Sequence, residues 1–327
     1  MGNSLEGSAR PLGRSGLKTL PLALGGNVFG WTADQKTSFE VLDRFVDAGF
    51  SLIDTADVYS KWVPGHVGGE SETILGRWLQ SRGNRARILL ATKVGGEIVP
   101  GRKGLTAAHI RWAAEESLRR LQTDYIDLYQ AHYDDPSVPF EETLRAFEDL
   151  IAAGKVRAIG VSNHDAQRLQ AALDAGKAQG LPRYETLQPL YNLYDRQEFE
   201  QKLAPICRAE GVGVINYYSL ASGFLSGKYR TEQDVSSSAR QRSNRKYMTG
   251  RGFRILEALD SVAARTGATQ AQIAIAWLIS RAEVTAPIVS ATSVAQLDEI
   301  IAAARLSLAR DALEQLSTAS SYDTPEA

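Results

Sequence analysis

The stretch Gly49-Phe-Ser-Leu-Ile-Asp-Thr-Ala-Asp-Val-Tyr-Ser60 decides how this chain folds. Residues 50–53 form a short apolar run that suits a buried strand, and Asp54 follows where a strand gives way to a loop. Tyr59 lies in that loop. A carboxylate buried at a strand end costs several kcal/mol unless a cation pairs with it, so Asp54 predicts a basic partner from elsewhere in the chain.

Two further strand-like runs end in residues that can carry charge. Residues 88–92 lead into Lys93, and residues 126–131 lead into His132. Taken singly, each residue could have a purely structural role. Asp54 could be a turn or cap residue and Tyr59 a loop aromatic, while Lys93 could be a solvated strand end and His132 a hydrogen-bonded core histidine. A parallel barrel, however, gathers the carboxyl ends of its strands on one face, where its active site lies. Together these residues therefore predict a catalytic site.

Strands and helices alternate along the whole chain. The predicted strands are residues 22–24, 50–53, 88–92, 126–131, 156–161, 186–188, 212–216 and 286–289. Asp34 and Thr106 begin predicted helices, and Pro139 and Gly154 bracket another. No change of composition marks a domain boundary. The expectation is α/β: one domain over 1–327, a single (β/α)8 TIM barrel over about 20–305, with an N-terminal hairpin at 10–20 and C-terminal helices at 293–304 and 312–316.

Composition narrows the class of protein. The composition, with 43% hydrophobic and 23% charged residues, is that of an ordinary globular protein. The formal net charge is -1, so the protein has no overall positive electrostatic potential that would attract nucleic acid or an anionic membrane. Cys207 is the only cysteine, which excludes an intramolecular disulfide. There is no signal-peptide pattern and no run of ~18 apolar residues, so we expect a cytoplasmic protein. The four histidines are scattered, and we expect no metal.

Several motifs in order resemble the aldo-keto reductase family. They are Asp54-x-x-x-x-Tyr59, Gly69-x-Ser71-Glu72, Lys93, His132, Gly160-Val161-Ser162-Asn163, Gln188, Tyr218-Ser219-Leu220, Gly227-Lys228-Tyr229 and Ala286-Pro287-Ile288-Val289. The resemblance spans about residues 10–305. It implies a barrel oxidoreductase that uses NAD(P)H to reduce an aldehyde or ketone to an alcohol, reversibly, by hydride transfer from C4 of the nicotinamide.

The resemblance assigns catalysis to Asp54, Tyr59, Lys93 and His132. Tyr59 is expected to protonate the developing alkoxide. A free phenol has a pKa of about 10, and a nearby ammonium such as Lys93 lowers it by favouring phenolate. Asp54 would pair with Lys93. His132 would donate a hydrogen bond that orients the carbonyl oxygen.

The family's cofactor residues carry over position by position. Ser162, Asn163 and Gln188 match the residues that bind the nicotinamide carboxamide, and Tyr218 matches the aromatic that stacks on its ring, with Tyr217 as a competitor. The pyrophosphate segment corresponds to Ser219, Leu220, Gly223 and Lys228, and the adenosine end to Ser290, Thr292 and Gln296. No Gly-x-Gly-x-x-Gly follows a strand, which argues against a Rossmann site.

The adenosine-end motif departs from the family pattern. Many relatives carry a basic residue close to Thr292 or Ser293, where it pairs with the 2'-phosphate of NADP. Here those hydroxyls, the start of the following helix, or a cation from the stretch with Arg240, Arg242, Arg245 and Lys246 would substitute. NADPH is still favoured, with NADH possible.

Three long connections are predicted to form the rim of the barrel: residues 27–33, 133–138 and 219–248. The last is either a solvated surface loop or a flap over the dinucleotide. Phe29, Trp31, Trp62 and Tyr133 are candidates for an apolar pocket that takes a ketone, an aldehyde or a cyclic polyol. Each could instead be a packed loop anchor.

Two other functions compete with carbonyl reduction. Channel β subunits resemble this family, keep the four catalytic residues and bind nucleotide, yet act mainly as partners. A barrel isomerase or lyase that uses no nicotinamide is the second. The sequence is compatible with a monomer or a small oligomer.

Overall fold

The computed structural model describes residues 9–231, 233–234 and 244–322, and its centre is an eight-stranded parallel sheet. The strand order is β10-β3-β4-β5-β6-β7-β8-β9. The strands are β3 (Ala23–Gly25), β4 (Leu52–Asp54), β5 (Leu89–Val94), β6 (Ile126–Ala131), β7 (Val156–Ser162), β8 (Thr186–Gln188), β9 (Gly213–Val214) and β10 (Ile288–Val289).

Backbone hydrogen bonds close this sheet into a barrel. The N–H groups of Thr285 and Ala286, just before β10, donate to the carbonyl of Val214 in β9 at 2.8 and 3.2 Å. The Ile288 N–H donates to the Asn216 carbonyl at 2.9 Å. The predicted (β/α)8 barrel is therefore confirmed, including each of its eight predicted strands.

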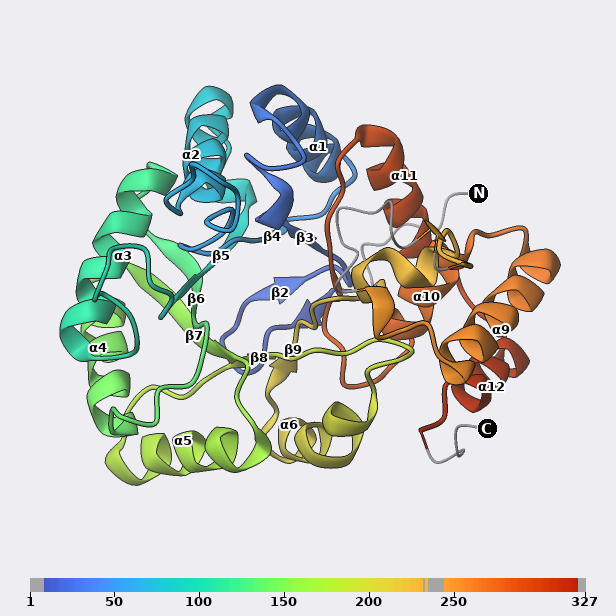
Figure 1. Ribbon diagram of the computed structural model, residues 1–327. Coiled ribbons are helices and arrows are strands. Elements are labelled where there is room, and N and C mark those ends of the chain that lie inside the picture. Colours follow the sequence, from blue (N-terminus) through green and yellow to red (C-terminus); the bar gives the residue numbers. More distant parts are fainter. Residues whose placement is uncertain (1–8, 232, 235–243, 323–327) are drawn as a thin grey trace.

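Helices surround the strands (Figure 1). They are α1 (Gln35–Asp47), α2 (Glu70–Arg82), α3 (Ala107–Leu121), α4 (Phe140–Ala152), α5 (Ala166–Gln179), α6 (Ala204–Glu210), α9 (Gly250–Thr266), α10 (Gln270–Ile279), α11 (Val294–Ala303) and α12 (Arg310–Ala319). The predicted caps are present, because Asp34 and Thr106 accept hydrogen bonds from the backbone of Thr37 and His109. Helix α12 packs on α9 outside the barrel ring.

The amino-terminal hairpin closes one end of the barrel. Strands β1 (Arg10–Pro11) and β2 (Lys18–Thr19) pair antiparallel, as predicted, and lie across the middle of the strand ring in Figure 1. Leu12 and Leu17, in and beside this hairpin, are buried in one cluster with the inward-facing Leu52, Ala91 and Leu128. This apolar plug fills the amino end of the barrel, so polar chemistry is confined to the carboxyl end.

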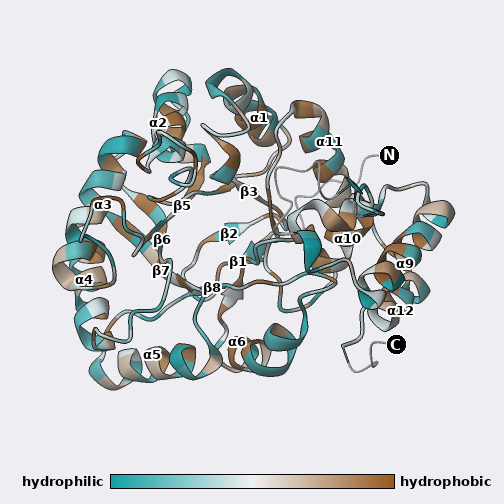
Figure 2. Cartoon of the chain, in the orientation of Figure 1, coloured by the Kyte–Doolittle hydropathy of each residue, from teal (hydrophilic) through white to brown (hydrophobic). Residues whose placement is uncertain are grey.

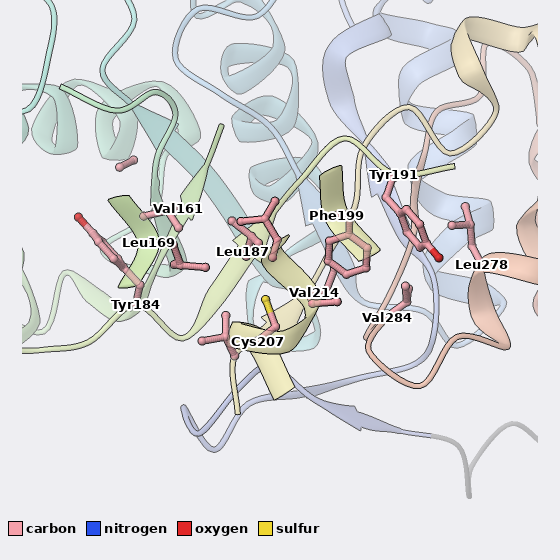
Figure 3. Close-up of a cluster of buried hydrophobic side chains, with 14 of the residues drawn as sticks. Val161, Leu169, Tyr184, Leu187, Tyr191, Phe199, Cys207, Val214, Leu278 and Val284 are labelled. Carbon is pink, nitrogen blue, oxygen red and sulfur yellow. The ribbon is translucent and has the colours of Figure 1, made fainter. Parts of the chain in front are cut away.

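A second apolar layer lies between the strands and the helices. Hydrophobic faces of the helices turn toward the sheet, while their outer faces are hydrophilic (Figure 2). Figure 3 shows Val161, Leu187 and Val214 from neighbouring strands with Leu169 of α5 and Cys207 of α6, all in one buried cluster. Within the described ranges, no helix is both long and apolar enough to cross a membrane.

Candidate active site

Three strand ends deliver the central residues to the carboxyl face of the barrel. Asp54 is the last residue of β4, Lys93 lies near the end of β5, and His132 follows β6. Asp54 pairs in register with Ala91, an inward-facing residue of the barrel core. Side chains alternate along a strand, so Lys93, two residues beyond Ala91, also points inward. The pleat of β5 thereby aims the Lys93 side chain at Asp54.

The ammonium group of Lys93 lies at the centre of the site and contacts its other polar groups. Its side chain has no solvent exposure, and Asp54 is 1% exposed. Lys93 Nζ donates to Asp54 Oδ2 at 2.6 Å, to the Thr55 carbonyl at 2.8 Å and to Tyr59 Oη at 2.8 Å. Burial lowers the pKa of Lys93, while the Asp54 carboxylate opposes that shift. Hydrogen bonds to these three acceptors compensate the free-energy cost of burying the ammonium charge.

The second oxygen of Asp54 is held by two amides. Gln188 Nε2 donates to Asp54 Oδ1 at 2.8 Å, and Gln130 Nε2 donates to it at 3.2 Å. Gln130 was not among the predicted site residues. The signal was available, because Gln130 lies two positions after Leu128 on the inward face of β6, where an amide requires a polar partner.

The pKa of Tyr59 is shifted in the direction opposite to the one expected from the sequence. Burial raises the pKa of Tyr59 well above its usual value, and the Asp54 carboxylate raises it further, although Lys93 was expected to lower it. Burial is the largest cause; the negative charge of Asp54 comes next, and the phenol also donates to Asp54 Oδ2 at 3.3 Å, which favours its protonated form. All three effects favour the protonated form of Tyr59.

His132 is neutral in this arrangement. Burial, and then the positive charge of Lys93, lower the pKa of His132 well below its usual value. Its ring stacks on Tyr133 with centroids 4.4 Å apart and meets the Tyr59 ring edge-on at 6.0 Å. Its Nδ1 atom is buried and has no hydrogen-bond partner among the described residues. A neutral imidazole keeps one N–H that can be donated.

The predicted carboxamide-binding residues lie beside this cluster. Ser162 ends β7, and its hydroxyl donates to the Gln188 carbonyl at 2.9 Å. Asn163 Nδ2 donates to the His132 carbonyl at 2.9 Å, and Asn163 Oδ1 accepts from Tyr217 Oη at 2.8 Å. The structure thus brings Ser162, Asn163 and Gln188 together with the four central residues.

The two tyrosines that are candidates for stacking on the nicotinamide have different environments. Tyr217 is half-buried, and its hydroxyl is engaged by Asn163. Tyr218 is 47% exposed, and its ring makes an edge contact with Tyr217 at 5.2 Å. Tyr218 is therefore the more exposed of the two rings, and Tyr217 is the one held beside the carboxamide-binding residues. Next to it, Ser219 Oγ donates to the Ile288 carbonyl at 2.7 Å and ties the segment to β10.

Strained backbone concentrates around the site. Among the described residues, the non-glycine positions with positive φ are Ser60, Gln122, Asn163, Tyr218, Ala221 and Ser222. Gln122 ends α3, and the others adjoin Tyr59 or belong to the predicted cofactor segments. Left-handed backbone disfavours residues with a Cβ, and such strain collects at functional sites. The residues with left-handed backbone therefore lie mostly on the carboxyl face of the barrel, where the polar site residues also lie.

The predicted phosphate and adenosine residues line the adjoining segments. Gly223 has φ +94°, and a Cβ there would lie 3.4 Å from Lys228 Nζ. Thr292 donates through its backbone N–H and its hydroxyl to Gln296 Oε1, both at 2.9 Å. Ser290 Oγ donates to Asn27 Oδ1 at 2.5 Å. Leu220 is half-buried before the 3-10 helix η5 (Ala221–Ser226). Residues 232 and 235–243 of the predicted flap, with Arg240 and Arg242, lie outside the described residues.

Three of the four predicted substrate residues lie at the rim, and one does not. Trp62 is 51% exposed and makes edge contacts with Trp31 at 5.6 Å and with Tyr59 at 6.1 Å. Tyr133 is 49% exposed. Phe29 has no exposure, so its assignment to a substrate pocket is wrong. The η2 turn (Gly26–Val28) directs the Phe29 ring into the core layer.

These features define a barrel enzyme whose polar cluster lies at the carboxyl ends of its strands. The sequence model of the Aldo/keto reductase family matches residues 21–320, so the chain belongs to this family of oxidoreductases. Among the described residues, no group of three or more His, Cys, Asp or Glu side chains is arranged to hold a metal ion.

Individual relatives agree with this assignment. The chain is 35% identical to the "Uncharacterized oxidoreductase YrpG" of Bacillus subtilis, over 97% of this chain and 98% of that protein. It is 36% identical to the "Aldo-keto reductase YhdN" of the same organism, over 79% and 76%. It is also 34% identical to the "Probable voltage-gated potassium channel subunit beta" of Arabidopsis thaliana, over 88% of each chain.

Proposed function

We propose that this protein is an NADPH-dependent reductase that converts an aldehyde or ketone to an alcohol, and the reverse. The observation that carries this proposal is the contact of the buried Lys93 ammonium with both Asp54 and Tyr59, beneath an open aromatic rim. Membership of the aldo/keto reductase family supplies the reaction class.

Proton transfer in this mechanism belongs to Tyr59. When bound, the reduced nicotinamide supplies a hydride to the carbonyl carbon. Tyr59 gives its proton to the carbonyl oxygen, which becomes the alcohol hydroxyl. The phenolate that Tyr59 leaves is stabilised by the Lys93 ammonium at 2.8 Å. Asp54 keeps that ammonium charged and in place, and its own position is fixed by Gln130 and Gln188.

His132 orients the substrate in this scheme. As a neutral imidazole it donates a hydrogen bond to the carbonyl oxygen without competing with Tyr59 for the proton. The carbonyl is flanked by Trp31, Trp62 and Tyr133, whose rings favour an apolar substituent. The proposed substrate class is therefore a carbonyl compound with an apolar or aromatic side.

The residues around Tyr218 fit a nicotinamide nucleotide. Tyr218, with Tyr217 as the competing residue, offers an aromatic ring for the nicotinamide, and Ser162 and Asn163 offer a hydroxyl and an amide for its carboxamide. Gly223 and Lys228 would hold the pyrophosphate, and Ser290, Thr292 and Gln296 the adenosine end. None of the three residues Ser290, Thr292 and Gln296 is basic, so recognition of the 2'-phosphate of NADPH would fall to hydroxyl and backbone groups.

The direct test is a titration of the protein with NADPH and, separately, NADH. Quenching of tryptophan fluorescence reports binding, and calorimetry gives the affinity. Tight and selective binding of NADPH would support the proposal, whereas preference for NADH would favour a dehydrogenase role. Binding of neither would reject the cofactor assignment and leave an isomerase or lyase as the better hypothesis.

One other function has a specific observation in its favour. The similarity to a protein described as a potassium channel subunit beta supports a role as a partner subunit. Steady-state turnover of simple aldehydes that is lost in Tyr59→Phe would reject this alternative. Nucleotide binding without turnover on a broad carbonyl panel would favour it.

A further inference from the structure

A hollow at the amino end of the barrel lies outside the site described above. It has a volume of about 700 Å³ and lies where the amino-terminal hairpin, the end of α6 and the end of α10 meet. Four arginines line it, Arg10, Arg14, Arg208 and Arg281, and Glu283 is the only carboxylate among the described residues of its lining. Because the whole chain has a formal net charge of -1, this hollow is a local concentration of positive charge.

The hairpin contributes two of the four guanidinium groups. Arg10 Nη1 donates to the Val284 carbonyl at 2.7 Å, and Nη2 donates to the Ile279 carbonyl at 2.8 Å. Burial lowers the pKa of Arg10. The Arg14 guanidinium lies over the backbone that ends α6, because a Cβ added to Gly211 would lie 3.1 Å from Arg14 Nε. Both groups are therefore held at the hollow by the fold.

Most of these cations lack an acidic partner. Arg208 forms an ion pair with Glu283. In the part of the chain that the structure describes, Arg10, Arg14 and Arg281 form no such pair with a carboxylate. Unpaired guanidinium groups that share one concave surface repel one another, and an anion bound between them would relieve that repulsion.

The ends of two helices offset part of the positive charge. The carboxyl-terminal caps of α6 and α10, Gly211 and Ser280, line the hollow, and each helix end carries about half a negative charge. Glu283 adds one more negative charge, so about two of the four positive charges stay uncompensated. A phosphoryl group carries about two negative charges at pH 7 and accepts paired hydrogen bonds from guanidinium groups.

We propose that this hollow binds a small organic phosphate, whose phosphoryl group contacts the arginines and whose organic part contacts the apolar lining of Pro11, Val212 and Val284. A volume of about 700 Å³ is in the range of small-molecule sites and exceeds what a bare phosphate fills. The site lies at the opposite end of the barrel from Lys93, and its occupation does not depend on the reaction proposed above.

Calorimetric titration with glucose 1-phosphate tests the proposal, with methyl glucoside as the uncharged counterpart. Glucose 1-phosphate has no free carbonyl group, so it cannot act as a substrate for carbonyl reduction. We expect one site with a Kd of about 0.1 mM at low ionic strength, and no binding of methyl glucoside. At about a hundred times its Kd, glucose 1-phosphate should also raise Tm by about 3–5 °C. Absence of binding would overturn the proposal.

Variants at both ends of the barrel locate the bound phosphate. Arg14→Ala and Arg281→Ala should each weaken binding of glucose 1-phosphate about tenfold, because a charge-assisted hydrogen bond is lost, and should leave the affinity for NADP+ unchanged. Arg111→Ala removes an exposed arginine of α3 and should change neither affinity. If Lys228→Ala lost the binding and Arg14→Ala kept it, the phosphate would lie in the proposed coenzyme segment and the proposal would fail. Failure of NADP+ to bind would reject the proposed function and leave this test intact.

Glu283→Gln gives a result that misfolding cannot imitate. It removes the carboxylate of the hollow and releases Arg208, so glucose 1-phosphate should bind about three- to tenfold more tightly. Unchanged or weaker binding by Glu283→Gln would contradict the proposal. Binding of a phosphoserine peptide or a single-stranded oligonucleotide in preference to glucose 1-phosphate would overturn the assignment to a small organic phosphate.

Discussion

Lys93 Nζ lies 2.6 Å from Asp54 Oδ2, and neither side chain has more than 1% of its surface exposed to solvent. Removing one partner of a buried ion pair leaves the other uncompensated and costs about 3–5 kcal/mol. We expect Asp54→Asn and Lys93→Met each to lower the free energy of unfolding by about this much. The double variant should lose less than the sum, because no lone charge remains.

Urea titration of the four proteins checks this prediction. The exposed pair of Arg111 and Asp149, 2.7 Å apart, is the control, and Asp149→Asn should cost less than about 1 kcal/mol. Additive losses at Asp54 and Lys93 would show that the two residues are not coupled in the folded protein.

The two directions of the reaction should depend differently on pH because of Tyr59. Because its pKa is raised, Tyr59 keeps its proton across the neutral range, so carbonyl reduction should stay level from about pH 6 to 9. Alcohol oxidation needs the phenolate and should rise with pH. Tyr59→Phe should lower kcat by about a hundredfold to ten-thousandfold without weakening cofactor binding.

Stopped-flow measurement of both directions over this pH range tests the assignment. The wild type and Tyr59→Phe are compared at saturating cofactor, with Tyr125→Phe, a tyrosine remote from the site, as the control. Turnover of Tyr59→Phe close to that of the wild type would assign the proton to another group.

Asp57 should make the stability of the protein depend on pH. It lies between Asp54 and Tyr59 in the sequence and is completely buried, and burial, followed by the charge of Glu72, raises its pKa well above 3.8. Between about pH 4 and that raised pKa the unfolded chain has lost a proton that the folded chain keeps. The free energy of unfolding contributed by Asp57 therefore falls as pH rises through this window.

Asp57→Asn removes the titrating group and nearly preserves its shape. Its stability relative to the wild type should increase from about pH 4.5 to about pH 7.5, in urea titrations at both values. Asp149→Asn, on the surface, serves as the comparison. A difference between Asp57→Asn and the wild type that stayed constant with pH would mean that Asp57 is ionised in the folded protein.

Much of the fold and of the central site could be predicted from local sequence. Apolar runs followed by Asp54 and His132, or leading into Lys93, mark strand ends, and the barrel topology then brings those ends together. The direction of the Tyr59 pKa shift could not be predicted this way. It depends on a hydrogen bond to Asp54 and on burial, and both are set by the packed site and not by the spacing of the residues.

Contacts between residues that are distant in sequence could not be predicted from the sequence either. Asn192 donates to the Tyr218 carbonyl and Asp195 accepts from Tyr247 Oη, and no motif in the sequence predicts either contact. Phe29 was misplaced for a related reason. A loop aromatic next to a predicted site suggests a rim residue, but the ring packs over Gly26, where an added Cβ would lie 3.1 Å from Phe29 Cδ2.

The contrast between Trp62 and Phe29 gives the last prediction. Trp62→Ala removes an exposed aromatic at the rim and should lower kcat/KM for a bulky aromatic aldehyde about tenfold, while changing that for a small aliphatic aldehyde little. Phe29→Ala should instead cost about 3–5 kcal/mol of unfolding free energy, because it opens a cavity in the core. At temperatures where Phe29→Ala is folded, its preference between the two aldehydes should match the wild type. If Phe29→Ala changed that preference while Trp62→Ala did not, the substrate would bind on the inner side of the Gly26–Val28 turn, and the pocket would not be the one proposed at the rim.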